Sequence, residues 1–315
     1  MSYESEMLKS LKMPVRADVE KELLLALFKH NGVIKEFGTG EEIVDEIARS
    51  FGLTEKQRTA FLETIYRKEN RPKKSYLWHR LLFRAADSLV KENLISRPTD
   101  TFRLTNQREW MLTEKGFDVA LKLLAIPNSK KEFLSTKSYE VQKIVKKLKK
   151  SKRPLHYDPV DNKKKTTTKI TEFRLRKRGF RWAVIEAYDF KCAICGMKIN
   201  SPDSHQWEVE AAHIVPHKIN GKDDIWNGLA LCHLHHWAFD VGWFTLLDNY
   251  SVKMSSKIQL LPFEFGKFGE TNFLRDFISR DSTIFLPREK EFYPHKNSLY
   301  WHRENIFNFY NKVTI

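Results

Sequence analysis

The sequence has few cysteines, no long apolar run and a shortage of acidic residues. Its 315 residues include three cysteines, an odd number that argues against a disulfide framework. A membrane-spanning helix needs roughly 18 or more consecutive apolar residues, and the chain contains no such segment. The first residues, MSYESEMLKSLKMP, lack the apolar centre of a signal peptide. Together these absences predict a cytoplasmic protein without a membrane partner.

The shortage of acidic residues leaves a strongly basic chain. Asp and Glu number 40 against 55 Lys and Arg, which gives a formal net charge of +15. The simplest partner for such a charge is a polyanion, DNA or RNA, and the alternative is a basic protein with no such partner. A length of 315 residues with 41% hydrophobic residues is enough for two domains, each with its own core.

The three cysteines lie in one region and follow a metal-binding spacing. Cys192 and Cys195 are separated by two residues, and so are Cys232 and His235. These two half-sites supply three thiolates and one imidazole, the ligand set of a closed structural Zn²⁺ site. The alternative is three buried free thiols, because cysteine is also a small core residue.

The residues between and after these half-sites predict a strand, a short apolar run and a helix. Residues 207–215 alternate and are rich in β-forming residues, which indicates a strand with Glu210 and Ala212 on the same face. A loop follows, and Asn227 then precedes a glycine and a short apolar run. Residues 233–241 predict a short helix, on which His236 and Asp240 project from one face because they are four apart.

These motifs resemble the HNH endonucleases, which have the ββα-metal fold. The resemblance is closest to the restriction-type branch, through EAAHI, NGLALC and HHWAFD, and it covers about residues 173–247. It implies that His213 is the general base, that Asn227 braces the metal loop and that His236 binds a catalytic metal ion. It also implies hydrolysis to 5′-phosphate and 3′-hydroxyl ends. The residue types suit this chemistry, because an imidazole can activate water and a divalent ion can stabilise charge on the phosphate.

One position departs from the family pattern. Many HNH enzymes carry a metal-binding Asp or His directly before the base, where this chain has Ala212. Glu210 on the same strand face and Asp240 beside His236 are the candidates to replace it, and such a ligand set favours Mg²⁺ or Mn²⁺. The alternatives are a solvent-facing strand residue for Glu210 and a helix-end hydrogen-bond acceptor for Asp240.

Residues 1–125 predict a winged-helix domain. After a loosely held arm over residues 1–13, the patterns predict helices at four places and then a β-hairpin and a last helix. The helices are expected at about 18–30 with Asp18 as cap, at about 40–51, after a Thr54–Gln57 capping box, and at about 76–93; the hairpin covers 94–104 and the last helix 110–124. The segment resembles the N-terminal winged-helix domain of Mrr-type restriction proteins, chiefly through WHRLLFRAADSLVKENLI, FRLT and LTEKGFDVAL.

A winged helix often places one helix in the major groove of DNA, with cations near phosphates and base edges. The candidates for DNA binding are Lys73, Lys74, Ser75, Tyr76, Arg80 and Arg84. Two alternatives remain open: these side chains only solvate a helix face, or the whole domain mediates protein contacts.

Residues 126–172 predict a basic linker between two domains. A helix is expected over residues 137–150, and the polar stretch 151–171 is expected to be mobile. Basic residues continue into the helix that opens the nuclease domain, residues 173–315, and Arg176 and Arg178 are further candidates for DNA binding. A generic solvated linker is the alternative.

The sequence therefore predicts an α+β protein, with an N-terminal winged helix and a zinc-containing C-terminal ββα-metal domain. The expected function is a metal-dependent endonuclease that cuts double-stranded DNA, a restriction enzyme whose target is either modified or unmodified DNA. Cutting both strands needs two active sites or two successive visits, which makes a homodimer a reasonable expectation. A zinc-stabilised DNA-binding regulator without catalysis is the alternative, which Ala212 leaves open, and a nuclease acting on RNA is a third possibility.

Overall fold

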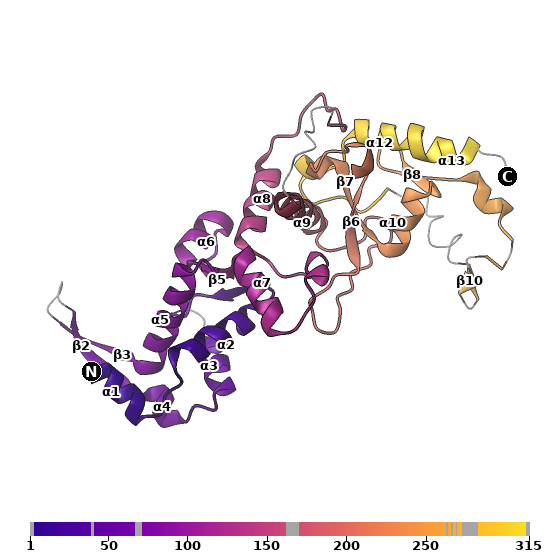
Figure 1. Cartoon of the computed structure of the whole chain (residues 1–315). Helices are drawn as coiled ribbons and strands as arrows, with labels where there is room; N and C mark the ends of the chain where they lie inside the picture. The colour runs from indigo at the N-terminus through magenta and orange to yellow at the C-terminus, as the bar shows by residue number, and fades with distance from the viewer. Residues whose placement is uncertain are drawn as a thin grey trace. The chain divides into compact units, whose positions relative to one another are not determined.

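The chain forms an α+β protein whose described residues divide into two compact units (Figure 1). The computed structural model describes residues 3–38, 41–66, 71–161, 170–262, 264–265, 267–268, 270–272 and 283–312. The units are Met1–Lys143 and Ile144–Ile315, and the boundary between them lies within helix α8 (Tyr139–Lys150). Among the described residues, no helix is long and apolar enough to cross a membrane.

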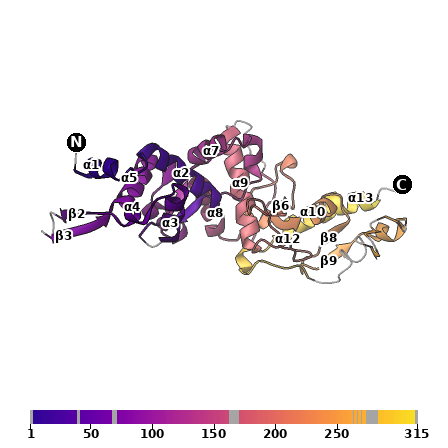
Figure 2. The same ribbon diagram turned by 90° about the horizontal axis from the view of Figure 1, so that it is seen from below.

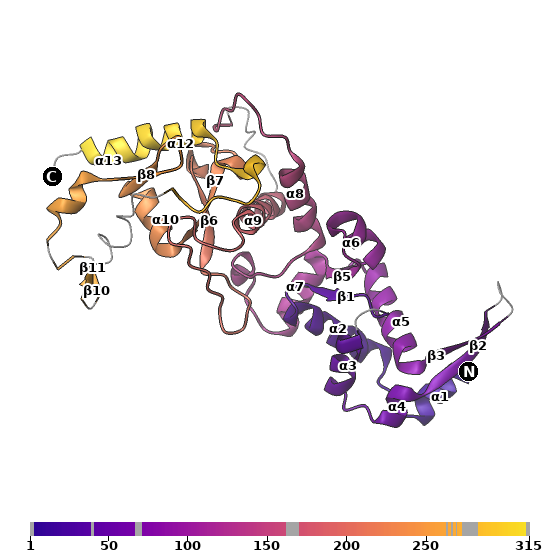
Figure 3. The same cartoon turned by 180° about the vertical axis from the view of Figure 1, so that it is seen from behind.

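The N-terminal unit combines a helical core with a small sheet. Its elements are α1 (Tyr3–Ser10), α2 (Arg16–Lys29), β1 (Val33–Lys35), α3 (Glu41–Ser50), α4 (Glu55–Thr59), β2 (Phe61–Tyr66), β3 (Arg71–Tyr76), α5 (Leu77–Lys91), β4 (Ile95–Ser96), α6 (Pro98–Thr105), β5 (Glu109–Leu112), α7 (Glu114–Leu123) and the 3₁₀ turn η1 (Asn128–Glu132). Strands β1, β5 and β4 form an antiparallel sheet in that order, and β1 and β5 lie among α2, α5 and α7 (Figure 3). The core forms because apolar residues recur on one face of each helix, as with Leu23 and Leu27 of α2 and Leu82 of α5.

Several predicted N-terminal helices are present, with one cap placed differently. Helix α3 covers most of the predicted range 40–51, and Thr54 caps α4 through the expected capping box with Gln57. Helix α2 begins earlier than predicted, so its N-cap is Val15 and Asp18 lies within its first turn. The prediction of Asp18 as the cap was therefore wrong, although its charge still suits the positive end of the helix dipole.

The β-hairpin predicted over residues 94–104 was wrong. Only Ile95 and Ser96 form a strand there, and residues 98–105 form helix α6. Pro98 occupies a first-turn position, where its fixed φ suits a helix and its missing N–H is not needed. Asn106 then ends α6 in the left-handed conformation, with φ +61°.

The last predicted helix begins later than expected. Residues 109–112 form β5, which pairs with β1 and β4, and α7 starts only at Glu114. The Thr113 hydroxyl accepts a hydrogen bond from the Gly116 N–H at 3.0 Å, which fixes this start. The apolar run before Thr113 is thus the central strand of the sheet.

Helix α1 and strands β1, β2 and β3 of the N-terminal unit were not predicted. The arm over residues 1–13 contains helix α1, whose Glu4 is buried. Strands β2 and β3 pair antiparallel from Phe61↔Tyr76 to Tyr66↔Arg71, in a stretch for which no strand was predicted. Figure 1 shows them as a two-stranded ribbon that extends beyond the first turn of α5.

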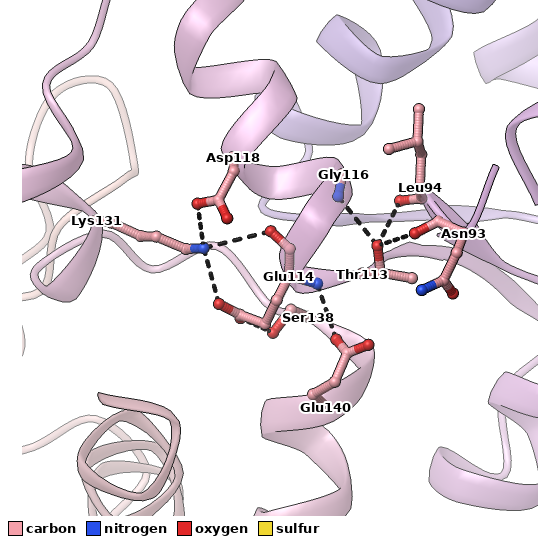
Figure 4. A network of polar contacts seen from close by, with 9 residues as sticks. All are labelled: Asn93, Leu94, Thr113, Glu114, Gly116, Asp118, Lys131, Ser138 and Glu140. Atoms are coloured by element: carbon pink, nitrogen blue, oxygen red, sulfur yellow. Dashed lines mark hydrogen bonds and ion pairs between the residues drawn. The ribbon is translucent and has the colours of Figure 1, made fainter. Parts of the chain in front are cut away.

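A polar network fastens the start of the predicted linker to α7 (Figure 4). The Lys131 ammonium group lies 2.8 Å from the Glu114 carboxylate and 2.5 Å from that of Asp118. The Glu140 carboxylate accepts from the Glu114 N–H at 2.8 Å, and the Ser138 hydroxyl donates to the Glu114 side chain. The boundary predicted at residue 125 therefore falls inside a packed region, and the N-terminal unit extends to Lys143.

The C-terminal unit contains the remaining elements. Besides part of α8, these are α9 (Ile170–Ala187), β6 (Val209–His213), η2 (His217–Ile219), η3 (Ile225–Asn227), β7 (Gly228–Cys232), α10 (His233–Asp240), β8 (Phe244–Leu246), β9 (Val252–Met254), η4 (Ser256–Leu260), β10 (Lys267–Phe268), β11 (Thr271–Asn272), η5 (Lys290–Phe292), α12 (Lys296–His302), the π-helical turn η6 (Arg303–Phe307) and α13 (Asn308–Lys312). Strands pair only as antiparallel two-stranded ribbons in the described part of this unit. Helices α10 and α12 lie close to β8 (Figure 2).

Part of the stretch that was predicted to be a mobile linker packs on the C-terminal unit. Tyr157 is buried, its hydroxyl donates to the Asp224 carboxylate at 3.1 Å, and its ring meets Trp226 edge-on at 5.8 Å. Arg153 donates to the Pro294 carbonyl at 2.9 Å. The prediction of mobility was wrong for residues 151–161, whereas residues 162–169 lie outside the described part of the chain.

Candidate active site

Strands β6 and β7 and helix α10 form the framework of the site. The strands pair from Val209↔Cys232 to His213↔Gly228, and α10 follows β7 directly. Helix α9 packs against both strands. A Cβ atom at Gly228 would lie 2.4 Å from Val184 and 3.1 Å from Phe180, so this close packing of α9 on β7 requires a glycine.

The four predicted zinc ligands come together as one cluster. The sulfur atoms of Cys192, Cys195 and Cys232 and a ring nitrogen of His235 all lie within 4.8 Å of one another. Cys192 and Cys195 come from the turn after α9, Cys232 ends β7, and His235 lies in the first turn of α10. Hydrogen bonds from the other two thiols lower the pKa of Cys192. The residue types and burial fit a structural Zn²⁺ ion, which would tie the turn, the strand and the helix together.

His213, the predicted base, lies at the end of β6 and is held on two sides. Its Nε2 atom lies 3.0 Å from the Asp223 carboxylate, and its ring stacks on Phe180 of α9 at 3.9 Å between centroids. Arg176 of α9 donates to the other oxygen of Asp223 at 2.9 Å. Burial alone would raise the pKa of Asp223, but the hydrogen bonds from His213 and Arg176 outweigh it and lower the pKa to about 2. Asp223 is therefore a fixed negative charge behind the imidazole.

Asn227 braces the loop between the two strands. Its side-chain oxygen accepts from the Val215 N–H at 2.9 Å, and its amide donates to the carbonyls of Val215 at 3.1 Å and Lys222 at 2.9 Å. The side chain is fully buried. Because Lys222 directly precedes Asp223, these bonds fix the position from which Asp223 reaches His213.

His236 lies between the two predicted carboxylate ligands. Its Nδ1 is 2.9 Å from the Glu210 carboxylate, and its Nε2 is 3.6 Å from that of Asp240. Burial would lower the pKa of His236, but the hydrogen bond to Glu210 and the charges of both acids raise it. Burial raises the pKa of Asp240, whereas His236 and His213 oppose this rise. Asp240 is therefore close enough to both predicted histidines for their charges to affect its pKa.

The three predicted ligands of the catalytic ion are neighbours with a suitable donor chemistry. Two carboxylates and one imidazole suit Mg²⁺ or Mn²⁺. His236, however, turns a different ring nitrogen toward each acid, so the three side chains do not aim single donor atoms at one point. Among the described residues, donor atoms from three or more side chains converge only in the cysteine cluster. Ala212 is buried and supplies no ligand.

The predicted DNA-binding residues differ widely in their surroundings. Arg178 is only 4% exposed, and we exclude it from any DNA-facing surface for that reason. Arg176 is engaged by Asp223, while Arg80 and Arg84 each donate to the buried Glu4 carboxylate at 2.8 Å.

The remaining candidates lie at the junction of β3 and α5. Lys74 is exposed and lies 3.1 Å from Glu63, and the Ser75 hydroxyl accepts from Arg80 at 3.3 Å. The exposed ring of Tyr76 lies near His79. The side chain of Lys73 lies outside the described residues.

Two residues that shape the site were not identified from the sequence. Asp223 is one of two adjacent acids that signalled only a loop, and its position shortly before Asn227 was the available clue. His302 is the other: it stacks on Phe239 of α10 at 3.6 Å and lies 2.9 Å from the Thr245 hydroxyl. It supports the end of α10 from which Asp240 projects.

Comparison with known proteins assigns this framework to a family. A family model described as HNH endonuclease matches residues 192–247, which include the zinc cluster, β6, β7 and α10. Residues 192–247 are therefore similar to an HNH endonuclease domain. The HNH domain contains every candidate for the general base and the catalytic ion, while Arg176 and Phe180, which contact Asp223 and His213, precede the match.

Solved structures and curated proteins add little to this assignment. The chain is similar to a structure titled "Modification dependent TagI restriction endonuclease", with 18% identity and a TM-score of 0.28. The similarity covers 40% of this chain and 37% of that one. No match was found among curated proteins.

Proposed function

We propose that this protein is a metal-dependent DNA endonuclease with a restriction role. The proposal depends on one observation: within the stretch that matches the HNH endonuclease model, the histidine at the end of β6 is held by Asp223 and a second imidazole is flanked by two carboxylates. The net charge of +15 supports a nucleic-acid substrate. The N-terminal unit would read the DNA, and the C-terminal unit would cut it.

His213 would act as the general base. When its Nε2–H donates to Asp223, Nδ1 carries the lone pair that accepts a proton from water, and Nδ1 has no partner among the described residues. The resulting hydroxide attacks the phosphorus, and the bond to the 3′ oxygen breaks, leaving 5′-phosphate and 3′-hydroxyl ends. Asp223 would stabilise the imidazolium that forms. A Mg²⁺ or Mn²⁺ ion would supply charge stabilisation at the phosphate and the leaving oxygen, and Glu210, His236 and Asp240 would hold it after turning their donor atoms toward one point.

The order of elements in the N-terminal unit supports a winged helix. Helix, strand and helix are followed by α5, β4 and β5, and the strands pair in the order β1, β5, β4. In this arrangement α5 would be the recognition helix, β2 and β3 an insertion before it, and α6 would stand in the place of the wing. Lys74 and Tyr76 at its start and Arg80 and Arg84 along it would then contact DNA.

Replacement of His213 by alanine tests the catalytic proposal. We expect the purified H213A protein to bind duplex DNA like the wild type and to cleave it roughly 10²–10⁴-fold more slowly with Mg²⁺ or Mn²⁺, because the general base is missing. His205→Ala, in a loop of the same domain outside the site, is the matched control and should cleave normally. Wild-type-like cleavage by H213A would reject the assignment, and binding without any cleavage by the wild type would favour a silent DNA-binding regulator.

The substrate and the assembly need separate measurements. Parallel digestion of methylated, hydroxymethylated and plain DNA, with RNA as a fourth substrate, tests the restriction role and any dependence on modification. Because cutting both strands needs two active sites or two visits, we propose a homodimer on DNA. Sedimentation of the H213A protein with a short duplex tests this. A single copy of H213A on a duplex that the wild type cuts in both strands would reject the homodimer.

A further inference from the structure

The N-terminal unit contains a cavity that the proposed reaction does not use. Its volume is about 740 Å³, and it is lined by residues of α5, the start of α6, β5 and the first residues of α2. Cavities that hold small ligands commonly measure roughly 300–1,000 Å³. In the topology of a winged helix, this cavity lies along the recognition helix, beside the element that replaces the wing.

One wall of the cavity is aromatic. Phe83 of α5 and Trp110 of β5 both line it, and Phe83 is 42% exposed. Buried Phe37 supports both rings, with centroids 5.1 Å from Phe83 and 5.4 Å from Trp110. An exposed ring on a rigid aromatic base offers a stacking surface to a planar ligand.

The indole of Trp110 supplies an unused donor. Its side chain is only 4% exposed, and the buried Nε1–H has no hydrogen-bond partner among the described residues. The other large buried indole of this unit, Trp78, donates to the Val44 carbonyl at 3.2 Å. A buried donor without an acceptor is unfavourable, so a ligand that brought an acceptor to this nitrogen would remove that cost.

The rest of the lining carries an excess of positive charge. Arg16, Arg84, Lys91 and Arg97 line the cavity, against the acids Glu36 and Asp87. Asp87 pairs with Arg97 at 2.5 Å and Lys91 at 3.5 Å, and Arg84 pairs with Glu4. Arg16 pairs with Glu20 at 3.1 Å, and Glu36 pairs with Arg108 at 2.6 Å, so an anion would share cations that already have acidic partners. Pro98 and Thr99 bring the positive end of the α6 dipole to the same lining. The lining therefore combines a stacking face, a buried donor and a site for an anion.

We propose that this cavity binds a nucleotide. The base would stack on Phe83 and accept a hydrogen bond from Trp110, while the phosphate would lie by the cations and the first turn of α6. The nucleotide is either free in solution or unstacked from DNA, and the second source depends on the proposed DNA-cleaving function. In that case the N-terminal unit reads DNA through an extruded base as well as through a groove.

Binding of two probes to the full-length H213A protein tests the proposal without interference from cleavage. The first probe is each of the four free deoxynucleoside monophosphates, measured by calorimetry. The second is a duplex with 2-aminopurine in a central mismatch, whose fluorescence rises when the base leaves the stack. We expect at least one probe to respond, and we expect Phe83→Ala to weaken that response roughly tenfold or more through lost stacking. Trp110→Phe keeps the ring, removes the donor and should weaken it roughly fivefold.

Phe102→Ala is the matched control, because Phe102 is similarly exposed at 48% but lies outside the cavity lining. A response to the monophosphates alone assigns a free nucleotide, and a fluorescence rise assigns a nucleotide within DNA. No response to either probe, or equal losses in F83A and F102A, would overturn the proposal. Phe83 is exposed, so F83A decides the matter even if W110F does not fold. Cleavage by the wild-type protein is scored separately, so failure of the nuclease proposal is distinguishable from failure of this one.

Discussion

The Asp223 side chain joins three parts of the C-terminal unit at the scale of single residues. It accepts from Arg176 of α9 and contacts His213 of β6, and the bonds of Asn227 to Lys222 fix its backbone. The imidazole is thereby fixed in orientation before any substrate binds. Its neighbour Asp224 has a different partner, the Tyr157 hydroxyl. Asp223 therefore orients His213, whereas the adjacent Asp224 holds Tyr157, and the two contacts can be removed separately by mutation.

The first prediction compares these two acids. Asp223→Asn should lower the rate of DNA cleavage roughly 10- to 100-fold, as when a residue that orients a functional histidine is removed. The affinity for DNA should change little, because Asp223 faces the imidazole and Arg176. Asp224→Asn is the matched control and should reduce thermal stability more than rate. Single-turnover rates and melting curves of both variants check this, and equal rates for D223N and the wild type would contradict a positioning role.

The second prediction concerns the buried His302. Burial lowers its pKa to about 3, so the folded protein keeps the ring neutral while the unfolded chain protonates it below its ordinary pKa of 6.5. The unfolded state therefore binds more protons between these values, and stability falls as the pH falls through that range, by about 1.4 kcal/mol per unit. His302→Gln should be less stable at pH 7.5 but should lose less stability on acidification. The difference between the two melting curves from pH 7.5 to 5 measures this, and parallel losses would contradict it.

At the scale of elements, the arrangements that depend on residues close together in the sequence were predicted well. Cys192 with Cys195 and Cys232 with His235 each lie within one turn of chain, so the local sequence nearly fixes their geometry. The strand that contains His213 and the helix that follows Cys232 were also predicted from local patterns. The contact between Asp223 and His213 was not, because a loop whose path is set by buried hydrogen bonds brings the two together.

The errors in the N-terminal unit also have physical causes. A segment with Pro and Asp signals a turn or the first turn of a helix equally well, and packing of the buried Thr101 against Ser96 favours the helix here. The apolar run at Trp110 became a central strand because β1, far away in sequence, pairs with it. Arg178 counted as a surface cation in the basic stretch, but its position on the inner face of α9 buries it. Such outcomes depend on tertiary contacts that propensity does not contain.

The third prediction is that a zinc ion stabilises the HNH domain. The cysteine cluster connects the turn after α9, β7 and α10, so removal of the metal should loosen all three elements. We expect one equivalent of zinc in the purified protein and a fall of about 10 °C or more in melting temperature for Cys232→Ser, a loss of about 3 kcal/mol or more. Elemental analysis and melting curves check this. Added Zn²⁺ should restore a chelator-treated wild type and added Mg²⁺ should not; a metal-free protein of unchanged stability would contradict the prediction.

At the scale of the whole molecule, the excess of basic residues should dominate binding to DNA. Each phosphate neutralised by a cation releases counterions, so the affinity should fall steeply with salt. We expect the plot of log K against log salt concentration to have a slope of about −5 or steeper for the H213A protein, which corresponds to roughly six phosphate contacts. A flat plot would contradict a polyanion as the partner.

A matched pair of lysines locates those contacts. Lys74→Gln should flatten the slope by about 1, because Lys74 lies on β3 just before the proposed recognition helix. Lys122→Gln, an equally conservative change of an exposed lysine on α7, should leave the slope unchanged. Equal changes of slope in the two variants would contradict the prediction, because they would show that the position of the lysine does not matter for DNA binding.

Helix α1 occupies two arginines that are proposed to bind DNA, and this contact would lower the affinity of the protein for DNA. The Glu4 carboxylate, only 7% exposed, bridges the guanidinium groups of Arg80 and Arg84 much as a phosphate diester would. A backbone that uses both arginines must therefore compete with this internal mimic and displace the amino-terminal turn. If Arg80 and Arg84 contact DNA as proposed, weak, non-specific duplexes would lose that competition more often than well-matched ones, and this acidic side chain would sharpen discrimination between targets.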